Sequence, residues 1–547
     1  MLTALEIENF KGIGSPVRIE LKPITLLFGP NNAGKSTILQ AIQYGHEILT
    51  NRNVDPRETH HGEGNVDLGG FKNFVHRREI DRAVRLRFEL DMTHTGLGEI
   101  MHPSPDVADE SGIETEMLKV AMGVIDEPLD CRCDNTDFFS IQSAALELVV
   151  DWCKKLGAPI LRTYSVEVDG EPCARIEASP DGSSVHLIPE FSHELFEPDD
   201  RAHAGEQPER LANDEDAEPD GLVSELAKAF SGFRIRVYGS NVIPRFGEVL
   251  PLGIESEDGR TSGKFLFPKF GYLLSQVLAG VGDIVRGVLA KQRYLGPIRD
   301  IVKRDYVLAV TEVAGGWARG LGAWNLLASS GAELARSVDD WLRRKDRLDT
   351  GFGLDISSLK VLREGGPLMA PNRRVTVRPE DPSEKFSALP TRTEVSLVDT
   401  TTGERFFPRD VGVGISQVLP VVVAALDPSR PLLTLIEQPE LHIHPKMQVA
   451  LGDLFASQID NEFGYRRLVL ETHSEHIMLR LLRRIEETHS GELPPGAPAL
   501  RPDQVSVVFI EQIEGEVRAT QLRIDESGEF IDRWPQGFFE ERAEELF

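Results

Sequence analysis

The sequence has little that would tie this 547-residue chain to a membrane. Its longest strongly apolar run, Val418 to Leu426, is far too short to span a bilayer. The N-terminus, Met1 to Ile7, soon becomes charged and alternating, and it lacks the basic-then-apolar layout of a signal peptide. We therefore expect a cytoplasmic protein with no membrane partner.

Cysteine is also scarce, and all four cysteines fall in one stretch of the chain: Cys131, Cys133, Cys153 and Cys173. A Cys-x-Cys pair followed by two widely separated cysteines does not have the paired short spacing of zinc ribbons. We expect reduced, partly buried thiols, and a structural zinc site is the less favoured alternative.

Excess positive charge is missing as well. Lys and Arg number 60 against 88 Asp and Glu, a net charge of −28, which works against long-range attraction to nucleic acid. Basic clusters occur at residues 76–78, 343–347 and 480–484, and such runs more often form solvated helix faces. Nucleic acid remains a possible partner only through local contacts.

What the chain does have is a complete phosphate-binding loop between an apolar strand, Ile24 to Phe28, and a helical stretch that starts at Ser36. Its glycines let backbone N–H groups turn toward phosphates, Lys35 reaches the β- and γ-phosphates, and the Ser36 hydroxyl can ligate Mg²⁺. A chance glycine-rich loop is disfavoured because both spacing and context fit. The predicted nucleotide-binding residues are Gly29, Pro30, Asn31, Asn32, Ala33, Gly34, Lys35, Ser36 and Thr37.

Period-two alternation of apolar residues predicts half-buried strands in the first part of the chain and hence a mixed α/β fold. The alternating runs lie at residues 5–7, 17–21 and 84–90. We assign residues 1–97 to one half of a nucleotide-binding core.

The pattern loosens after residue 97, and we assign residues 98–290 to an insertion. Within it, residues 194–221 are acidic and read as a linker, whereas helical spacing of apolar residues predicts a helix within 264–291. Residues 291–394 read as a helical connecting region with an amphipathic helix at 338–348. The chain is long enough for two or more domains, or for one domain with such an insertion.

Strand-like alternation returns near Val395, and we assign residues 395–490 to the second half of the core, followed by a small C-terminal domain at 491–547. Three short motifs lie in this half: Gly412-Val413-Gly414-Ile415-Ser416-Gln417 before a helix, Glu437-Gln438-Pro439-Glu440 after the strand 432–436, and Glu471-Thr472-His473-Ser474 after the strand 468–470.

Phosphate loop, signature-like loop, Walker B strand and switch histidine, in that order, resemble an ABC-type ATPase core. The wide separation of Lys35 and Glu437 is similar to the SMC and RecF-like branch, and most similar to the OLD (overcoming lysogenization defect) ATPases. The likeness covers residues 1–95 and 290–547, and it is carried by Ile7 to Gly12, Tyr294 to Arg299, Asp410 to Pro420, Ile436 to Pro445 and Gly528 to Phe547. It implies an α/β, ABC-type P-loop ATPase core split by a large, partly helical insertion.

The resemblance also implies site roles. ATP and Mg²⁺ would be bound by Lys35, Ser36 and Thr37 with the loop backbone, and Glu437 would hold the metal-bound water. Ser416 would touch the γ-phosphate of a second subunit, which implies a homodimer or a higher oligomer, although this serine could also be a plain helix N-cap. His473 would sense the γ-phosphate. His444 falls where the D-loop normally has aspartate, and with His442 it could also be a surface residue of a turn.

One residue departs from the ABC pattern, because Gln438 stands where these enzymes have the glutamate that polarises the attacking water. An amide cannot accept the proton of that water. We therefore expect slow hydrolysis, or a substitute carboxylate for which Glu440 and Glu471 are the nearby candidates. The other hypothesis is that ATP mainly clamps a dimer.

The resemblance further implies a place in a larger system. OLD-type proteins often continue into a Toprim nuclease, yet residues 474–547 contain no Asp-x-Asp pair, so we expect an effector on a separate chain. We predict an ATP-binding sensor or regulatory subunit, plausibly in anti-phage defence. The alternatives are a RecF-like DNA-maintenance ATPase and a noncatalytic scaffold. The C-terminal aromatics Trp534, Phe538, Phe539 and Phe547, with Leu546, are expected to pack on the core rather than to form a docking surface.

Overall fold

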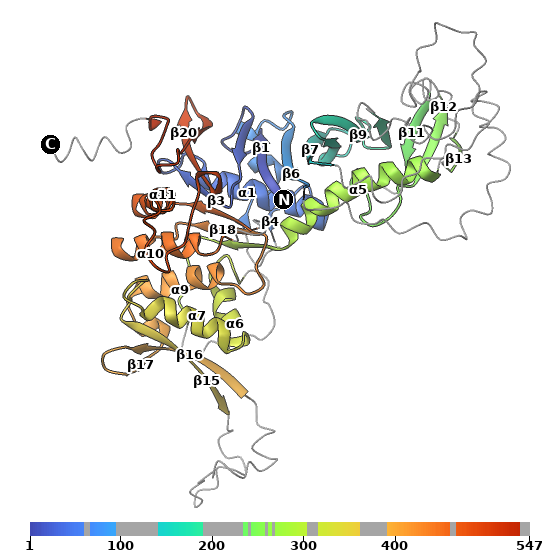
Figure 1. Ribbon diagram of the computed structural model, residues 1–547. Helices are drawn as coiled ribbons and strands as arrows, with labels where there is room; N and C mark the ends of the chain where they lie inside the picture. The colour runs from blue at the N-terminus through green and yellow to red at the C-terminus, as the bar shows by residue number, and fades with distance from the viewer. Residues whose placement is uncertain are drawn as a thin grey trace, which may run out of the picture.

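The computed structural model describes residues 1–59, 66–93, 141–189, 233–238, 242–256, 261–264, 268–302, 316–360, 391–459 and 466–535. Two large sheets dominate these residues, with helices between them and on the outer face of one of them (Figure 1). Among the described helices, none is both long enough and apolar enough to cross a membrane.

A six-stranded sheet forms the centre of the molecule and has the strand order β14-β18-β19-β3-β20-β21. Only its edge strand β21 is antiparallel, which leaves a parallel core buried on both faces. The strands are β3 (Ile24–Phe28), β14 (Gln292–Leu295), β18 (Leu433–Glu437), β19 (Arg467–Glu471), β20 (Val505–Ile513) and β21 (Glu516–Leu522). The sheet therefore joins segments from both ends of the chain, as the split core predicts.

The second sheet is antiparallel and contains strands that were not predicted from the sequence. Its order is β13-β12-β11-β10-β9-β8-β7-β6-β1-β2. The strands are β1 (Leu2–Glu8), β2 (Val17–Glu20), β6 (Val84–Asp91), β7 (Ser143–Cys153), β8 (Ala158–Val168), β9 (Glu171–Ala178), β10 (Val185–Pro189), β11 (Phe233–Val237), β12 (Leu252–Ser256) and β13 (Thr261–Lys264). Strands of the expected insertion thus continue the sheet that the N-terminal strands begin.

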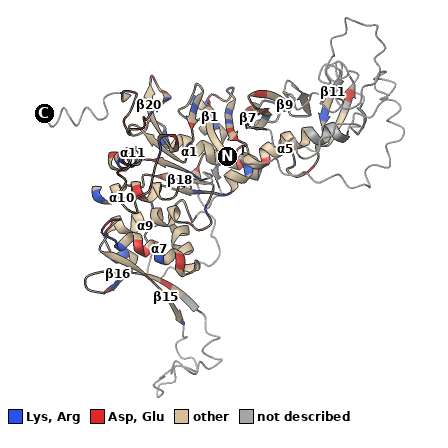
Figure 2. Cartoon of the chain, in the orientation of Figure 1, with Lys and Arg blue, Asp and Glu red and all other residues tan. Residues whose placement is uncertain are grey.

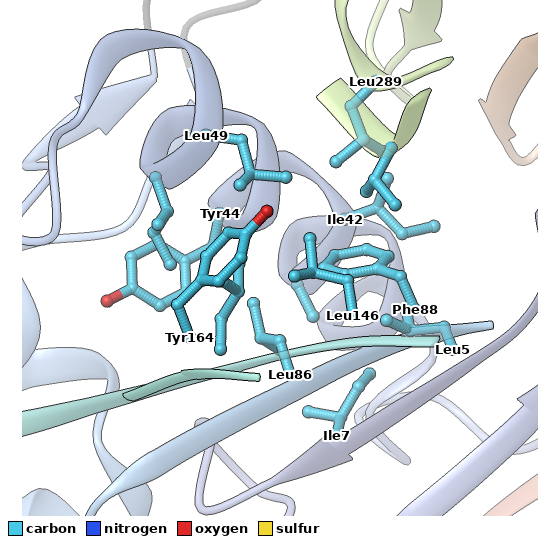
Figure 3. Close-up of a cluster of buried hydrophobic side chains, with 14 of the residues drawn as sticks. Leu5, Ile7, Ile42, Tyr44, Leu49, Leu86, Phe88, Leu146, Tyr164 and Leu289 are labelled. Atoms are coloured by element: carbon cyan, nitrogen blue, oxygen red, sulfur yellow. The ribbon is translucent and has the colours of Figure 1, made fainter. Parts of the chain in front are cut away.

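Helix α1 (Lys35–Asn51) lies between the two sheets, and helix α5 (Pro268–Ala290) continues this layer along strands β7 to β9 of the antiparallel sheet (Figure 1). Helix α1 begins directly after the phosphate loop, and α5 is the helix expected within residues 264–291. Figure 3 shows Ile42 and Leu49 of α1 packed over Leu86 and Phe88 of the antiparallel sheet, with Leu289 of α5 beside them. This layer is one continuous apolar core, because residues of both sheets and both helices belong to it.

The other face of the parallel sheet is covered by three helices: α9 (Val413–Ala425), α10 (Pro445–Ala456) and α11 (Glu475–Ser490). Alternate residues of each parallel strand point to this second core, so Leu26 faces it whereas Leu27 faces the first. The long apolar run at 418–426 is the buried body of α9.

Beyond α9 lie α6 (Leu321–Ser329), α7 (Ala332–Arg343) and a three-stranded sheet of β15 (Phe352–Lys360), β16 (Thr391–Asp399) and β17 (Arg405–Phe406), at the bottom of Figure 1. The helix expected at 338–348 starts earlier and ends at Arg343. Arg344 is extended, and the amide of Leu348 donates to the Trp341 carbonyl, so the chain turns back over the end of the helix. The described residues also contain three short elements, β4 (Glu58–Thr59), β5 (Val66–Asp67) and α2 (Phe71–Phe74), and 3₁₀ turns at His76–Arg78, Pro408–Asp410 and Pro502–Gln504.

The C-terminal segment, which is described as far as residue 535, contributes strands β20 and β21 to the central sheet. Strand β20 pairs in parallel with β3, so this segment completes the central sheet. Trp534 packs against the rings of Phe28, Phe509 and Phe530, as expected for burial. Phe538, Phe539, Leu546 and Phe547 lie outside the described residues, as does the acidic stretch at 194–221.

The basic clusters noted in the sequence are largely neutralised by neighbouring carboxylates. Figure 2 shows Lys and Arg interspersed with Asp and Glu on these helices rather than collected on one face. The pairs are Arg343 with Asp339, Arg344 with Asp340 and Asp346, Arg347 with Asp340, Arg480 and Arg484 with Asp453, and Arg483 and Arg484 with Glu487. This pairing with acids favours the expected solvated helix faces over a nucleic-acid patch.

The packing of α1 on the antiparallel sheet gives a first prediction. A Cβ atom added to Gly45 of α1 would lie 2.4 Å from Cζ of the buried Phe88, so helix and strand are in tight contact. Phe88→Ala should lower the free energy of unfolding by about 3–5 kcal/mol, measured by urea denaturation. Leu156→Ala, at a side chain that is 56% exposed, is the matched control and should change it by less than about 0.5 kcal/mol. Equal effects of both variants would contradict this packing.

Candidate functional site

The phosphate loop lies at the carboxyl end of β3, where parallel α/β sheets bind their ligands. Gly29 has φ +144°, and a Cβ atom there would lie 1.9 Å from the Ile510 carbonyl oxygen, so only glycine fits against β20. Pro30, Asn31 and Asn32 form the exposed tip of the loop. Ala33 is buried, and Gly34, in the left-handed conformation, is the N-cap of α1.

Lys35 points into the loop that precedes it. Its Nζ donates to the carbonyl oxygens of Gly29 at 2.9 Å and Pro30 at 2.8 Å, and the residue is only 3% exposed. Burial lowers the pKa of Lys35, and the attraction of Glu471, Glu440 and Glu437 partly offsets this. The ammonium group thus lies where a loop of this kind holds phosphate oxygens.

Two glutamates meet Ser36 at the ends of adjacent strands. Glu437 ends β18, Glu471 ends β19, and the two residues are register partners. The Ser36 hydroxyl lies 2.7 Å from Oε2 of Glu471 and 3.3 Å from Oε2 of Glu437. Ser36 and Thr37 both belong to the first turn of α1, so the sheet brings the predicted residues of the two core halves into one site.

The electrostatics of this carboxylate pair are unfavourable without a cation. Burial, and next the charge of Glu437, raise the pKa of Glu471 to about 7. Burial also raises the pKa of Glu437, although hydrogen bonds from Tyr294 and Ser36 oppose this. Because like charges this close resist joint ionisation, the pair holds a proton in part at neutral pH.

The donor set suits Mg²⁺. Two carboxylates and a hydroxyl are hard oxygen ligands, and Mg²⁺ is usually bound by one or two carboxylates together with substrate phosphates and water. Within the described ranges, no group of three or more His, Cys, Asp or Glu side chains is placed to hold a metal ion. A magnesium ion here would therefore rely on Ser36 and on nucleotide oxygens as well as on the glutamates.

Tyr294 is a site residue to which the sequence assigns no role beyond the family resemblance. It comes from β14, and its hydroxyl donates to Oε1 of Glu437 at 2.5 Å. This bond holds one carboxylate oxygen while Oε2 faces Ser36. No local sequence signal could have found this contact, because Tyr294 and Glu437 lie more than a hundred residues apart in the chain.

Gln438 lies directly after Glu437 in a positive-φ conformation (φ +44°), and its amide donates to the Glu471 carbonyl oxygen at 2.7 Å. Glu440, one of the two candidate substitutes, is already engaged, because its carboxylate accepts from the Thr472 hydroxyl and the His473 amide, each at 2.7 Å. Of the two candidates, Glu471 is therefore the one next to Ser36.

The His473 ring lies near the phosphate loop. Burial and the charge of Lys35 lower its pKa, so the neutral imidazole is favoured. Its Nε2 is buried and has no hydrogen-bond partner in the described structure. A buried imidazole nitrogen of this kind is available to a ligand that enters the loop.

Ser416 lies in the first turn of α9 and is buried within the chain. Helix α9 begins at Val413 with Gly412 as its N-cap, so Ser416 is not the N-cap. Its hydroxyl is fully buried and donates to the Pro408 carbonyl at 2.6 Å. The exposed residues at this helix start are instead Gly412 and Val413.

The two histidines after the Walker B strand are exposed residues of a turn. His444 is the N-cap of α10, and its Nδ1 accepts from the Lys446 amide at 3.2 Å. His442 has φ +63°, and its carbonyl oxygen would lie 2.5 Å from a Cβ atom on Gly414. This close approach holds the start of α9 against the turn and requires glycine at position 414.

Two of the four cysteines can be placed. Cys153 and Cys173 are buried free thiols, and burial raises the pKa of Cys173 to about 12, as expected for an inert core thiol. Cys131 and Cys133 lie outside the described residues.

The carboxylate pair makes stability depend on pH. The folded-state pKa of Glu471 is raised above its ordinary value, so the folded protein loses stability as pH rises from about 4.5 toward 7. Without Mg²⁺ at pH 8, Glu471→Gln should raise the free energy of unfolding by on the order of 1–3 kcal/mol, and at pH 5 the gain should vanish. Urea denaturation at both pH values measures this, with the exposed Glu404→Gln as control. A gain of the same size at both pH values would contradict the assignment.

Comparison with protein families gives three partial matches. Residues 1–82 match the family described as "AAA ATPase domain", and residues 328–479 match "AAA domain, putative AbiEii toxin, Type IV TA system". Residues 500–547 match "Protein of unknown function (DUF3696)". No curated protein matches the chain by sequence.

Among solved structures, the chain is similar to heads of SMC proteins. One is the SmcHead bound to the C-winged helix domain of ScpA, with 10% identity, a TM-score of 0.36, and coverage of 96% of this chain and 98% of that chain. Another is the SMC head domain from Thermotoga maritima, with 8% identity, a TM-score of 0.34, and coverage of 96% and 99%. A third is the Smc head domain with an extended coiled coil bound to the C-terminal domain of ScpA, derived from Pyrococcus furiosus, with 11% identity, a TM-score of 0.35, and coverage of 100% and 98%.

The two ATPase-domain matches fall on the two halves of the central site. The first contains the phosphate loop, and the second contains α9, Glu437, Glu471 and His473. The chain therefore carries an AAA-type, ATP-binding P-loop ATPase core within a mixed α/β fold.

Proposed function

We propose that this protein is a Mg²⁺-dependent ATPase whose site is completed by a second copy of the chain. The observation that carries this proposal is the Ser36 hydroxyl at hydrogen-bonding distance from both Glu437 and Glu471, directly after a phosphate loop. Bound Mg²⁺ would neutralise charge that develops on the phosphates. The chain's own residues supply its ligands, the phosphate contacts and a proton acceptor.

Each site residue then has a distinct role. Lys35 and the loop amides bind phosphate oxygens, and Ser36 with Glu437 orients the metal. Glu471 accepts the proton of the attacking water in place of Gln438, because its carboxylate lies 2.7 Å from the Ser36 hydroxyl and ends the strand next to Glu437. His473 contacts the γ-phosphate through its buried Nε2.

Exposed apolar side chains near the start of α9 support a dimer. Ile298 is 79% exposed and Val413 is 49% exposed. Ile298 precedes Arg299, which contacts α9 through Gln417, so both apolar residues belong to the neighbourhood of this helix start. We propose that this region covers the nucleotide of a second copy, with backbone amides of residues 412–414 facing its γ-phosphate, as anions are favoured at helix N-termini.

The biological role that we propose is that of a cytoplasmic, OLD-like sensor or regulatory subunit that controls a separate effector, a nuclease or a toxin, in anti-phage defence. The description of the family matched at residues 328–479, which names a toxin–antitoxin system, is in keeping with such a setting. A RecF-like role on DNA has less support, since the net charge is −28 and the basic clusters are paired with acids.

ATP turnover tests the catalytic proposal. Wild-type protein with Mg²⁺ should release phosphate, Lys35→Ala should abolish nucleotide binding, and Glu471→Gln should lower kcat by about 100-fold or more while binding persists. Glu440→Gln should have a smaller effect, because Glu440 acts through Thr472 and His473. If Glu471→Gln and Glu440→Gln both left turnover intact, neither glutamate would be the proton acceptor.

Mass measurement tests the dimer. Purified Glu471→Gln protein, which should retain ATP, is expected to shift from monomer to dimer when ATP and Mg²⁺ are added. Ile298→Asp should weaken this dimer by about 10-fold or more, because a charge would replace an apolar contact. Leu479→Asp, at another exposed apolar residue, on α11, is the control and should dimerise normally. A protein that stays monomeric with ATP contradicts the composite site.

A further inference from the structure

Arg299 is buried at the centre of the site and makes its hydrogen bonds to main-chain oxygens. Its Nη2 donates to the carbonyl of Glu437 at 2.5 Å and to that of Gln438 at 3.2 Å. Its Nη1 donates to the carbonyl of Gln417 on α9 at 3.4 Å. One guanidinium group therefore joins the end of the Walker B strand to the helix that begins at the proposed subunit contact.

Gln417 makes the return connection. Its side-chain Nε2 donates to the Arg299 carbonyl at 2.7 Å, and this amide is buried together with the arginine. This bond to the Arg299 carbonyl does not involve the guanidinium. It therefore links α9 to the 294–299 segment without a contact to Glu437. Breaking it leaves the longer bond, from the Arg299 guanidinium to the Gln417 carbonyl at 3.4 Å.

The segment that carries Arg299 also carries Tyr294. Arg299 holds the main chain at Glu437 and Gln438, and Tyr294 holds the Glu437 side chain. The positive φ of Gln438 makes this peptide a strained point that depends on its neighbours. Buried charged groups are costly unless they are well satisfied, and the planar guanidinium reaches three carbonyls from two elements at once.

We infer that Arg299 and Gln417 are positioning residues that couple the start of α9 to Glu437. When nucleotide bound to the second copy contacts the N-terminus of α9, this helix shifts. Gln417 and Arg299 transmit the shift to Glu437, whose carboxylate holds the metal in the same copy as α9. Each of the two sites in a dimer thereby senses whether the other is filled. This inference rests on the proposed function, because it requires the composite site.

The opposite end of α9 offers a matched control. Arg466 is also buried and donates to the carbonyls of Ala425 at 2.7 Å and Ala424 at 2.9 Å. It thus anchors the same helix by the same kind of contact, but it contacts the last turn of α9 rather than Glu437. A purely structural role for buried arginines on α9 would make Arg466 and Arg299 equivalent.

The experiment is steady-state ATP turnover over a range of ATP concentrations, with nucleotide binding to dilute protein measured by a fluorescent ATP analogue. Wild-type protein should show a Hill coefficient above 1. Gln417→Met should bind nucleotide with an affinity within about twofold of that of wild type. The variant should nevertheless lose cooperativity, and its kcat should fall about 10-fold, which is the usual range for removing a residue that orients a metal ligand. Arg299→Lys, which keeps the charge but not the three-carbonyl geometry, should show the same pattern.

Arg466→Met should lower thermal stability while the Hill coefficient stays at the wild-type value. Wild-type cooperativity and kcat in Gln417→Met would overturn the coupling. So would an equal loss of cooperativity in Arg466→Met, since the effect would then come from α9 packing alone. Wild-type protein that binds ATP without turning it over would instead contradict the proposed function, and the inference with it.

Discussion

The parallel pairing of β3 with β19 and β20 is the constraint on which the rest of the structure depends. It inserts a strand from the start of the chain between two strands from its last third. The register places Glu471 opposite Leu27, at the end where β3 gives way to the phosphate loop. Because a slip of one residue would turn every side chain to the other face, this register fixes both the two apolar cores and the position of Glu471 beside Ser36.

The site that this pairing creates contains two carboxylates that repel each other. Glu437 and Glu471 are buried side by side, and burial raises the pKa of both. The Tyr294 hydroxyl, the Ser36 hydroxyl and the Lys35 ammonium offset part of this cost. A protein built in this way gains stability when cation and nucleotide bind, because ligands that bind only the folded state shift the folding equilibrium.

Much of the parallel sheet could be predicted from sequence, since β3, β18 and β19 are short apolar runs that end in the phosphate loop, Glu437 and Glu471. Strands β7 and β8 were missed although Leu146 and Leu148, and Val166 and Val168, alternate, because the looser composition around them suggested an insertion. The burial of Ser416 could not be predicted from the sequence, because a motif gives the order of residues but not which face of the helix is buried. Tyr294 and Arg299 act through strand packing across more than a hundred residues, which no local pattern reports.

We propose one ATPase site that is assembled from both halves of the core and closed by a second copy of the chain. Its most direct test is the specific ATPase activity of the wild-type protein as a function of protein concentration at saturating ATP and Mg²⁺. A site closed by a second copy predicts activity per molecule that rises with concentration and then levels off as dimers form. Activity per molecule that is constant over the whole range would contradict it.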